Sequence, residues 1–168
     1  YYDFDPTRTD GGTPLPANNF YSYTDYEIAF SSPDKNLFKF RTGLQYGDFF
    51  NGTKFSFKNE FKFRVQPYFN TSLRIDYDSI ELPEPYQTRN IWLLSPKFEL
   101  TFTKQFYWTT YVQYSNQSEN LGINSRLQWR FAPLSDLYLV YNDNYYTSDK
   151  ITPKVRSINL KLTYWINI

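Results

Sequence analysis

Three acidic residues have the chemistry to act as paired carboxylates in glycoside hydrolysis: Glu60, Asp76 and Glu99. Glycosidases use two carboxyl groups, and one of them must carry a proton to act as the general acid. Each of these residues has Lys or Arg close by in the sequence, and a neighbouring cation favours the ionised carboxylate. We therefore expect no catalytic residues among them and predict that the protein is not an enzyme.

Tyrosine rings offer a second kind of chemistry, because an aromatic face can stack on a sugar ring. Tyr107, Tyr111 and Tyr138 fall on the polar side of the strands expected around them. Tyrosines in such places more often fill space and hydrogen-bond to neighbouring polar groups. We favour this structural role and keep sugar stacking as the alternative.

The composition excludes most other reactions. The chain of 168 residues contains no Cys, His or Met. It therefore has no thiol nucleophile, no Ser-His-Asp triad and none of the usual zinc ligands, and we predict no metal and no cofactor. The formal net charge is +1, so the chain as a whole does not attract nucleic acid, and we predict no nucleic-acid partner.

Aromatic residues dominate the apolar content. They make up 22% of the chain, with 17 Tyr, 16 Phe and 4 Trp, while the mean hydropathy is -0.65. No uncharged apolar stretch approaches the ~20 residues that a membrane-spanning helix requires. A disordered chain is excluded as well, because disordered segments are poor in aromatic residues.

The main structural signal is an alternation of apolar and polar residues with a period of two, which indicates strands with two different faces. In the clearest run, Phe55, Phe57, Phe61 and Phe63 alternate with charged or small polar residues. Similar runs cover 26–30, 38–46, 69–77, 92–102, 107–114, 123–131, 137–142 and 157–168. We therefore predict an all-β fold with about nine to ten strands, each near the ~9–11 residues of a tilted membrane strand.

Two architectures fit this alternation: a soluble β-sandwich or barrel, and a transmembrane antiparallel up-and-down β-barrel. The interior of a soluble barrel is too crowded for this many large apolar side chains. Tyr and Trp also gather near strand ends, as in the aromatic girdles of membrane barrels. We favour the transmembrane barrel, with this aromatic girdle: Tyr46, Tyr77, Trp92, Trp108, Tyr114, Trp129, Tyr141 and Tyr164.

The other face of the expected strands is charged, and basic residues outnumber acidic ones on it. We interpret it as the wall of a polar lumen, with basic residues Lys39, Arg41, Lys54, Lys58, Lys62, Arg64, Arg74, Arg126 and Arg130. One interpretation is a wall that prefers anions or binds a plug. The other, which we favour, is a solvated and salt-bridged lumen, because polar lumens are usual in this fold.

The connections between strands are expected to alternate in length, as in outer-membrane barrels. Short ones are expected at 31–36, 65–68, 103–105 and 132–136, and longer, extracellular ones at 47–52, 79–88, 115–122 and 146–154. Residues 1–19 are predicted to form an extracellular loop with a strand stub at Tyr1–Phe4, and residues 20–168 the barrel strands. The strand count predicts the C-terminal part of a larger barrel, whose first and last strands here do not pair with each other.

The stretch from Gly47 to Ile168 carries more specific sequence. It includes Gly-Asp-Phe-Phe-Asn-Gly-Thr at 47–53, Glu-Leu-Pro-Glu at 81–84, Val-Gln-Tyr at 112–114, Asn-Leu-Gly-Ile-Asn at 120–124, a long run at 126–143 and Leu-Lys-Leu-Thr-Tyr-Trp-Ile-Asn at 160–167. It resembles the C-terminal barrel region of large bacterial surface proteins of uncharacterised domain type. Those proteins typically carry an N-terminal module like a family-9 carbohydrate-binding module, which is not present here. The resemblance implies a cell-surface protein connected with sugars, and it implies no catalytic residues.

Two functions follow as expectations. The first is a barrel in the outer membrane of a Gram-negative bacterium that anchors a surface module, carbohydrate-binding in the resembling family, or passes a solute. The second is an accessory barrel subunit of a larger outer-membrane complex for nutrient uptake, secretion or barrel insertion. The expected partners are outer-membrane lipid and either other outer-membrane proteins or the rest of the same barrel.

Overall fold

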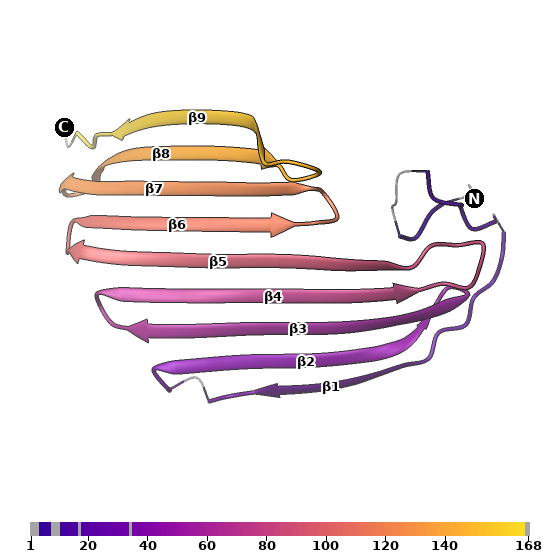
Figure 1. Ribbon diagram of the computed structural model, residues 1–168. Helices are drawn as coiled ribbons and strands as arrows, with labels where there is room; N and C mark the ends of the chain where they lie inside the picture. The colour runs from indigo at the N-terminus through magenta and orange to yellow at the C-terminus, as the bar shows by residue number, and fades with distance from the viewer. Residues whose placement is uncertain (1–3, 8–10, 17, 34, 167–168) are drawn as a thin grey trace.

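The chain folds into one antiparallel sheet in which each strand pairs with the next along the sequence (Figure 1). The structure is a computed structural model that describes residues 4–7, 11–16, 18–33 and 35–166. Its nine strands are β1 (Asp25–Ser31), β2 (Phe38–Phe49), β3 (Gly52–Val65), β4 (Phe69–Glu81), β5 (Arg89–Thr103), β6 (Phe106–Ser115), β7 (Asn120–Ala132), β8 (Ser135–Tyr146) and β9 (Thr152–Thr163). The predicted all-β, up-and-down arrangement is confirmed.

The sheet is open, whereas the sequence predicted a barrel. Among the described residues, β1 pairs with β2 alone and β9 pairs with β8 alone, so that each leaves one edge free. The expectation that the first and last strands do not pair with each other is therefore confirmed. No helix in the described part of the chain is long and apolar enough to cross a membrane.

The register of the strands separates the side chains into two faces, because residues opposite each other in a ladder point the same way. Phe57 lies opposite Tyr77, which lies opposite Trp92, while Lys58 lies opposite Asp76. The apolar face is the one that carries Ile28, Leu44, Phe57, Ile75, Leu94, Val112, Ile123, Leu139 and Leu160. The polar face carries Glu27, Gln45, Lys58, Asp76, Lys97, Tyr111, Asn124, Asn142 and Asn159.

No described strand packs across the apolar face. Its side chains are exposed from one end of the sheet to the other, with Leu44 39%, Phe98 41% and Leu160 70% accessible. Only Leu15, Ile80 and Leu82 count as buried apolar residues among those described. A sheet normally buries its apolar face against a second layer, so this face requires a cover that the sheet itself does not supply.

Of the three buried apolar residues, Leu15 belongs to the N-terminal segment, which the structure describes over residues 4–7 and 11–16. Leu15 donates its backbone N–H to the carbonyl of Phe4, and the two residues form an isolated bridge. Arg89, which lies opposite Ile80 on the polar side of the sheet, donates to the carbonyl of Thr7 at 2.9 Å. The segment therefore lies over the polar face, at the end of the sheet that carries the β4–β5 connection (Figure 1). Of the predicted strand stub, residues 1–3 lie outside the described residues.

The predicted alternation of connection lengths is wrong at two places. Residues 47–52 were expected to form a long loop, but β2 runs to Phe49 and β3 begins at Gly52, leaving only Phe50 and Asn51 between them. At the opposite end of the sheet, the β1–β2 connection spans 32–37 and is longer. The long loop at 47–52 was predicted because Gly47 and Gly52 were interpreted as turn residues, but both lie in strands.

These glycines allow a close approach of neighbouring chain. A Cβ on Gly52 would lie 2.0 Å from the carbonyl oxygen of Glu81, and one on Gly47 would lie 2.4 Å from that of Thr24. A Cβ on Gly43, also in β2, would meet nothing closer than 4.0 Å. Backbone atoms cannot rotate away as a flexible side chain can, so the first two positions require glycine.

We expect Gly52→Ala to reduce the free energy of unfolding by about 1–3 kcal/mol, because the end of β4 must move to admit the methyl group. Gly43→Ala is the matched control and should change stability by less than about 0.5 kcal/mol. Thermal unfolding followed by circular dichroism measures both. Equal effects of the two substitutions would show that close approach does not explain the glycines.

Candidate functional site

All the residues of the predicted basic wall lie on the polar face. Lys39 and Arg41 come from β2, Lys54, Lys58, Lys62 and Arg64 from β3, Arg74 from β4, and Arg126 and Arg130 from β7. Residues two positions apart on a strand point to the same side of the sheet. The alternation in the sequence therefore puts these basic residues on the same face as the polar residues opposite them on the adjoining strands. Their role in a lumen stays a prediction.

Many of these cations have an acidic partner on the same face. The ion pairs are Lys54–Asp78 at 3.4 Å, Lys62–Glu60 at 2.9 Å, Arg74–Asp76 at 2.8 Å, Lys97–Glu99 at 2.7 Å and Arg130–Asp136 at 3.3 Å. Three of the pairs join residues two positions apart on one strand, which point to the same side. The salt-bridged description of the wall therefore fits these residues.

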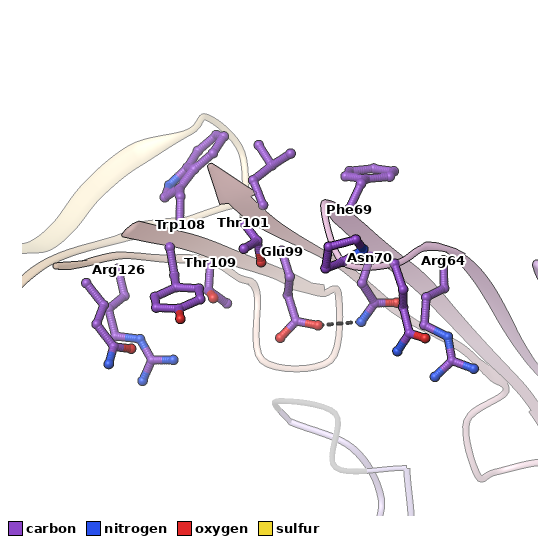
Figure 2. Close-up of a pocket in the computed structure, with 13 residues that line it drawn as sticks. Arg64, Phe69, Asn70, Glu99, Thr101, Trp108, Thr109 and Arg126 are labelled. Carbon is purple, nitrogen blue, oxygen red and sulfur yellow. Dashed lines mark hydrogen bonds between the residues drawn. The ribbon is translucent and has the colours of Figure 1, made fainter. Parts of the chain in front are cut away.

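A smaller set of cations is left without a partner. In the described part of the chain, the side chains of Arg41, Lys58, Arg64 and Arg126 form no ion pair and no hydrogen bond. Arg64 and Arg126 stand on either side of a hollow in the polar face (Figure 2). Arg41 and Lys58 line a second hollow of about 440 Å³ over β2 to β4, and the hollow between Arg64 and Arg126 is the larger of the two.

The hollow has a volume of about 700 Å³ and extends over β3 to β7. It lies toward the ends of these strands at the β3–β4 and β5–β6 turns. Its lining residues are Arg64, Gln66, Pro67, Phe69, Asn70, Glu99, Leu100, Thr101, Tyr107, Trp108, Thr109, Arg126 and Gln128. In Figure 2 the side chains of Arg64, Asn70, Glu99 and Arg126 point to one side of the sheet, and those of Phe69 and Trp108 point to the other.

Glu99 lies at the middle of the hollow. It accepts a hydrogen bond from the Asn70 amide (dashed in Figure 2) and pairs with Lys97 through its other oxygen. An ionised carboxylate accepts through both oxygens, whereas a general acid must donate a proton. The arrangement therefore places a fixed acceptor in the hollow, and no second carboxylate lines it.

The separation of the two free arginines restricts what the hollow can bind. Arg64 is on β3 and Arg126 on β7, and neighbouring strands are about 4.8 Å apart, so about 19 Å of sheet lies between them. No single small anion can contact both guanidinium groups. A ligand that uses both must carry at least two anionic groups, and the amides and hydroxyls between them suit a chain of hydroxyl-bearing units.

The tyrosines considered for sugar stacking do not act together. Tyr107 lines the hollow, and its hydroxyl donates to the carbonyl of Lys104. Tyr138 accepts a hydrogen bond from Gln128 at 3.2 Å, and neither it nor Tyr111 lines the hollow. These bonds fit the structural role that the sequence favoured for Tyr107 and Tyr138.

The residues of the predicted girdle lie on the apolar side of the sheet, toward its two ends. Tyr46, Tyr77, Trp92 and Tyr114 approach the end with the β4–β5 connection, Trp108, Trp129 and Tyr164 approach the other, and Tyr141 lies nearer the middle of β8. The rings of Tyr77 and Trp92 are 4.4 Å apart between centroids. Their place at a membrane interface stays a prediction.

The structure also brings together residues that the sequence analysis did not single out. Asp143 of β8 lies opposite Arg156 of β9, and both are on the apolar face. The signal was present in the phase of the strands, because Asp143 continues the series Leu139, Tyr141. We call Asp143, Arg156, Tyr141 and Tyr145 the Asp143 cluster.

Comparisons with known proteins add no identification: no family model, no curated protein and no solved structure matches this chain.

An oligogalacturonate should bind the hollow, and a neutral oligosaccharide of equal length should bind much more weakly. Arg64→Gln and Arg126→Gln should each weaken oligogalacturonate binding about tenfold, because each removes a charge-assisted hydrogen bond. Isothermal titration calorimetry measures the affinities. Lys161→Gln, on the polar face outside the hollow, is the charge-matched control, and an equal loss there would indicate only a general electrostatic effect.

Proposed function

We propose that this chain forms part of the wall of a transmembrane β-barrel in the outer membrane of a Gram-negative bacterium, which anchors a surface module or passes a solute. The observation that carries the proposal is the exposed apolar face. It extends over every strand, while the described residues bury only Leu15, Ile80 and Leu82 as apolar side chains. Hydrocarbon is the cover that fits a face of this extent, since exposed apolar patches on soluble proteins are far smaller.

The dimensions of the sheet support the same function. Strands β2 to β9 contain 10 to 15 residues. A tilted membrane strand requires about 9–11 residues, so each of these strands is long enough to cross the hydrocarbon layer. Every strand also pairs with its chain neighbour, which satisfies the backbone polar groups that lipid cannot.

The polar face supports a water-filled lumen on the opposite side of the wall. Its basic residues outnumber its acidic ones, and the unpaired cations Arg41, Lys58, Arg64 and Arg126 favour anionic solutes. The N-terminal segment lies across this face near one mouth. A partly covered lumen is compatible with both anchoring and selective passage of a solute.

The open edges of the sheet require further strands. In lipid, the free N–H and C=O groups of β1 and β9 would each cost several kcal/mol. We propose that the barrel is closed by other strands, contributed by the rest of the same protein as in the family that the sequence resembles. The second candidate function, an accessory subunit of a larger outer-membrane complex, follows if a partner chain closes these edges instead. Chemical cross-linking from β1 and β9 in cells discriminates the two.

Substitutions at adjacent residues test which face contacts lipid. Phe57 and Lys58 lie at the middle of β3 on opposite faces. Arg on the lipid-facing side near the bilayer midplane costs about 2–4 kcal/mol, so Phe57→Arg should sharply reduce the folded, membrane-inserted fraction. Lys58→Ala should leave that fraction close to wild type, because Lys58 has no ionic partner to lose. Heat-modifiable mobility on gels of membrane fractions reports the folded fraction, and equal tolerance of both changes would reverse or reject the assignment.

Epitope tags test the orientation. Tags in the connections 82–88 and 116–119 should be accessible to antibody on intact cells. Tags in the turns 66–68 and 104–105 should become accessible only after the outer membrane is permeabilised. Labelling of the second pair on intact cells would invert the proposed orientation, and labelling of neither pair would argue against a surface location.

A further inference from the structure

The Asp143 cluster is a polar site on the apolar face. A single oxygen of Asp143, Oδ2, accepts hydrogen bonds from the hydroxyl of Tyr145 at 2.7 Å, from the hydroxyl of Tyr141 and from Nε of Arg156 at 2.9 Å. The terminal nitrogen Nη2 of Arg156 lies 2.8 Å from the same oxygen and donates to the Tyr145 hydroxyl at 3.2 Å. The side chain of Asp143 is 1% exposed, whereas that of Arg156 is 58% exposed.

This arrangement lowers the stability of the folded state. The other carboxylate oxygen of Asp143 is buried without a hydrogen-bond partner among the described residues. A buried polar atom left unpaired costs stability, and so does an ion pair on an apolar surface. The cluster is therefore better explained by what it holds in place than by a contribution to stability. What it holds is the guanidinium group of Arg156.

One side of that guanidinium group is free. Nε and Nη2 face Asp143 and Tyr145, and the third nitrogen, Nη1, forms no hydrogen bond within the described residues. Because Asp143 neutralises the charge at close range, Arg156 can lie on an apolar surface and still present donors outward. The two N–H groups of Nη1 stay available, and the planar guanidinium fixes their direction, so they can donate to the oxygens of a phosphate group.

The position of the cluster along the strands selects the ligand. Tyr145 lies opposite Leu121, which lies opposite the girdle residue Tyr114, so its hydroxyl marks the level of the aromatic girdle. Arg156 is the fifth residue of β9, and its Nη2 donates to that hydroxyl at 3.2 Å. In a membrane barrel this level is the headgroup region, where a charged side chain on the lipid side costs only about 0–1 kcal/mol.

We propose that Arg156, positioned by Asp143 and the two tyrosines, binds the phosphate group of an anionic lipid headgroup in the outer leaflet. The inference rests on the proposed function, because it needs the apolar face to contact lipid. It adds a specific lipid site next to β9, on the outer surface of the wall and separate from the hollow on the polar face.

Lipid binding to the purified full chain tests the site. The protein in a neutral detergent is titrated with phosphatidylglycerol, with phosphatidylcholine or with inorganic phosphate, and native mass spectrometry counts the bound molecules. The variant that removes both charges, Asp143→Asn with Arg156→Gln, retains a hydrogen-bonding side chain at each position and avoids leaving a buried lone carboxylate. Lys161→Gln is the matched control, since it removes one positive charge from the same strand on the opposite face.

Wild type and Lys161→Gln should bind phosphatidylglycerol alike, and the double variant about tenfold more weakly. Arg156→Lys, which keeps the charge but loses the planar guanidinium group, should fall between them. Equal binding of phosphatidylglycerol to wild type and the double variant would overturn the proposal. Inorganic phosphate that binds at micromolar concentration and competes with the lipid would assign the site to a soluble phosphate instead.

Flotation with vesicles of phosphatidylcholine alone separates this test from that of the proposed function. Wild type and the double variant should both float, because insertion depends on the apolar face and not on Arg156. Absence of flotation for both would reject the membrane function and, with it, the lipid as the source of the phosphate. Flotation of both with equal phosphatidylglycerol binding would reject the Arg156 site alone.

Discussion

The antiparallel backbone ladder, continuous from β1 to β9, is the constraint on which the rest of the structure depends. Because successive side chains in a strand point to opposite sides, the register decides the face of every residue at once, and a slip by one position would exchange the faces of a whole strand. The ladder keeps Phe57, Tyr77 and Trp92 in one row and Lys58 with Asp76 in the next. Cations, aromatic rings and the hollow therefore all take their places from hydrogen bonds between main-chain atoms. The side chains in turn hold the register, because slippage would mix charges with aromatic rings.

The alternation explains how much could be predicted from the sequence. It was enough to give the strand order, the faces and the placement of the basic wall, since a period of two is a local property. Connections were harder, because glycine was interpreted as a turn signal. Gly47 and Gly52 instead lie in strands where the carbonyls of Thr24 and Glu81 approach, a contact between segments distant in sequence. The hollow was not predicted either, because it depends on which cations lack partners, and Arg64 and Arg126 differ from Lys54 or Arg130 only in their cross-strand surroundings.

Charged residues are partly exposed on the polar face, whereas on the apolar face Asp143 is buried. On the polar face, Lys62 with Glu60 and Lys97 with Glu99 are pairs in which both side chains are about a third to a half exposed. Such pairs contribute little to stability, since water already solvates both partners. On the apolar face, Asp143 has almost no exposure, and two tyrosine hydroxyls and Arg156 surround one of its oxygens. The charged residues predicted to be important from the sequence were all on the polar face. A charged residue in phase with an apolar series is a separate signal, because it must be matched locally before such a strand can fold.

The same environment has to cover the exposed apolar face and to provide hydrogen-bond partners for the open edges of the sheet. A soluble partner with its own apolar surface could cover the face of β2 to β8, but it would leave the outer hydrogen-bonding groups of β1 and β9 to water or to a separate contact. Additional strands at β1 and β9 would satisfy the edges, yet they would extend the exposed face rather than cover it. Closure of the sheet with the apolar face outward in lipid meets both needs, since closure removes the edges and hydrocarbon covers the face. The same closure gives the basic residues of the polar face a common interior, where the unpaired Arg41, Lys58, Arg64 and Arg126 act on the same enclosed water. The case for a barrel wall therefore depends on the combination of the two features, and either one alone would leave a soluble assembly as an equal alternative.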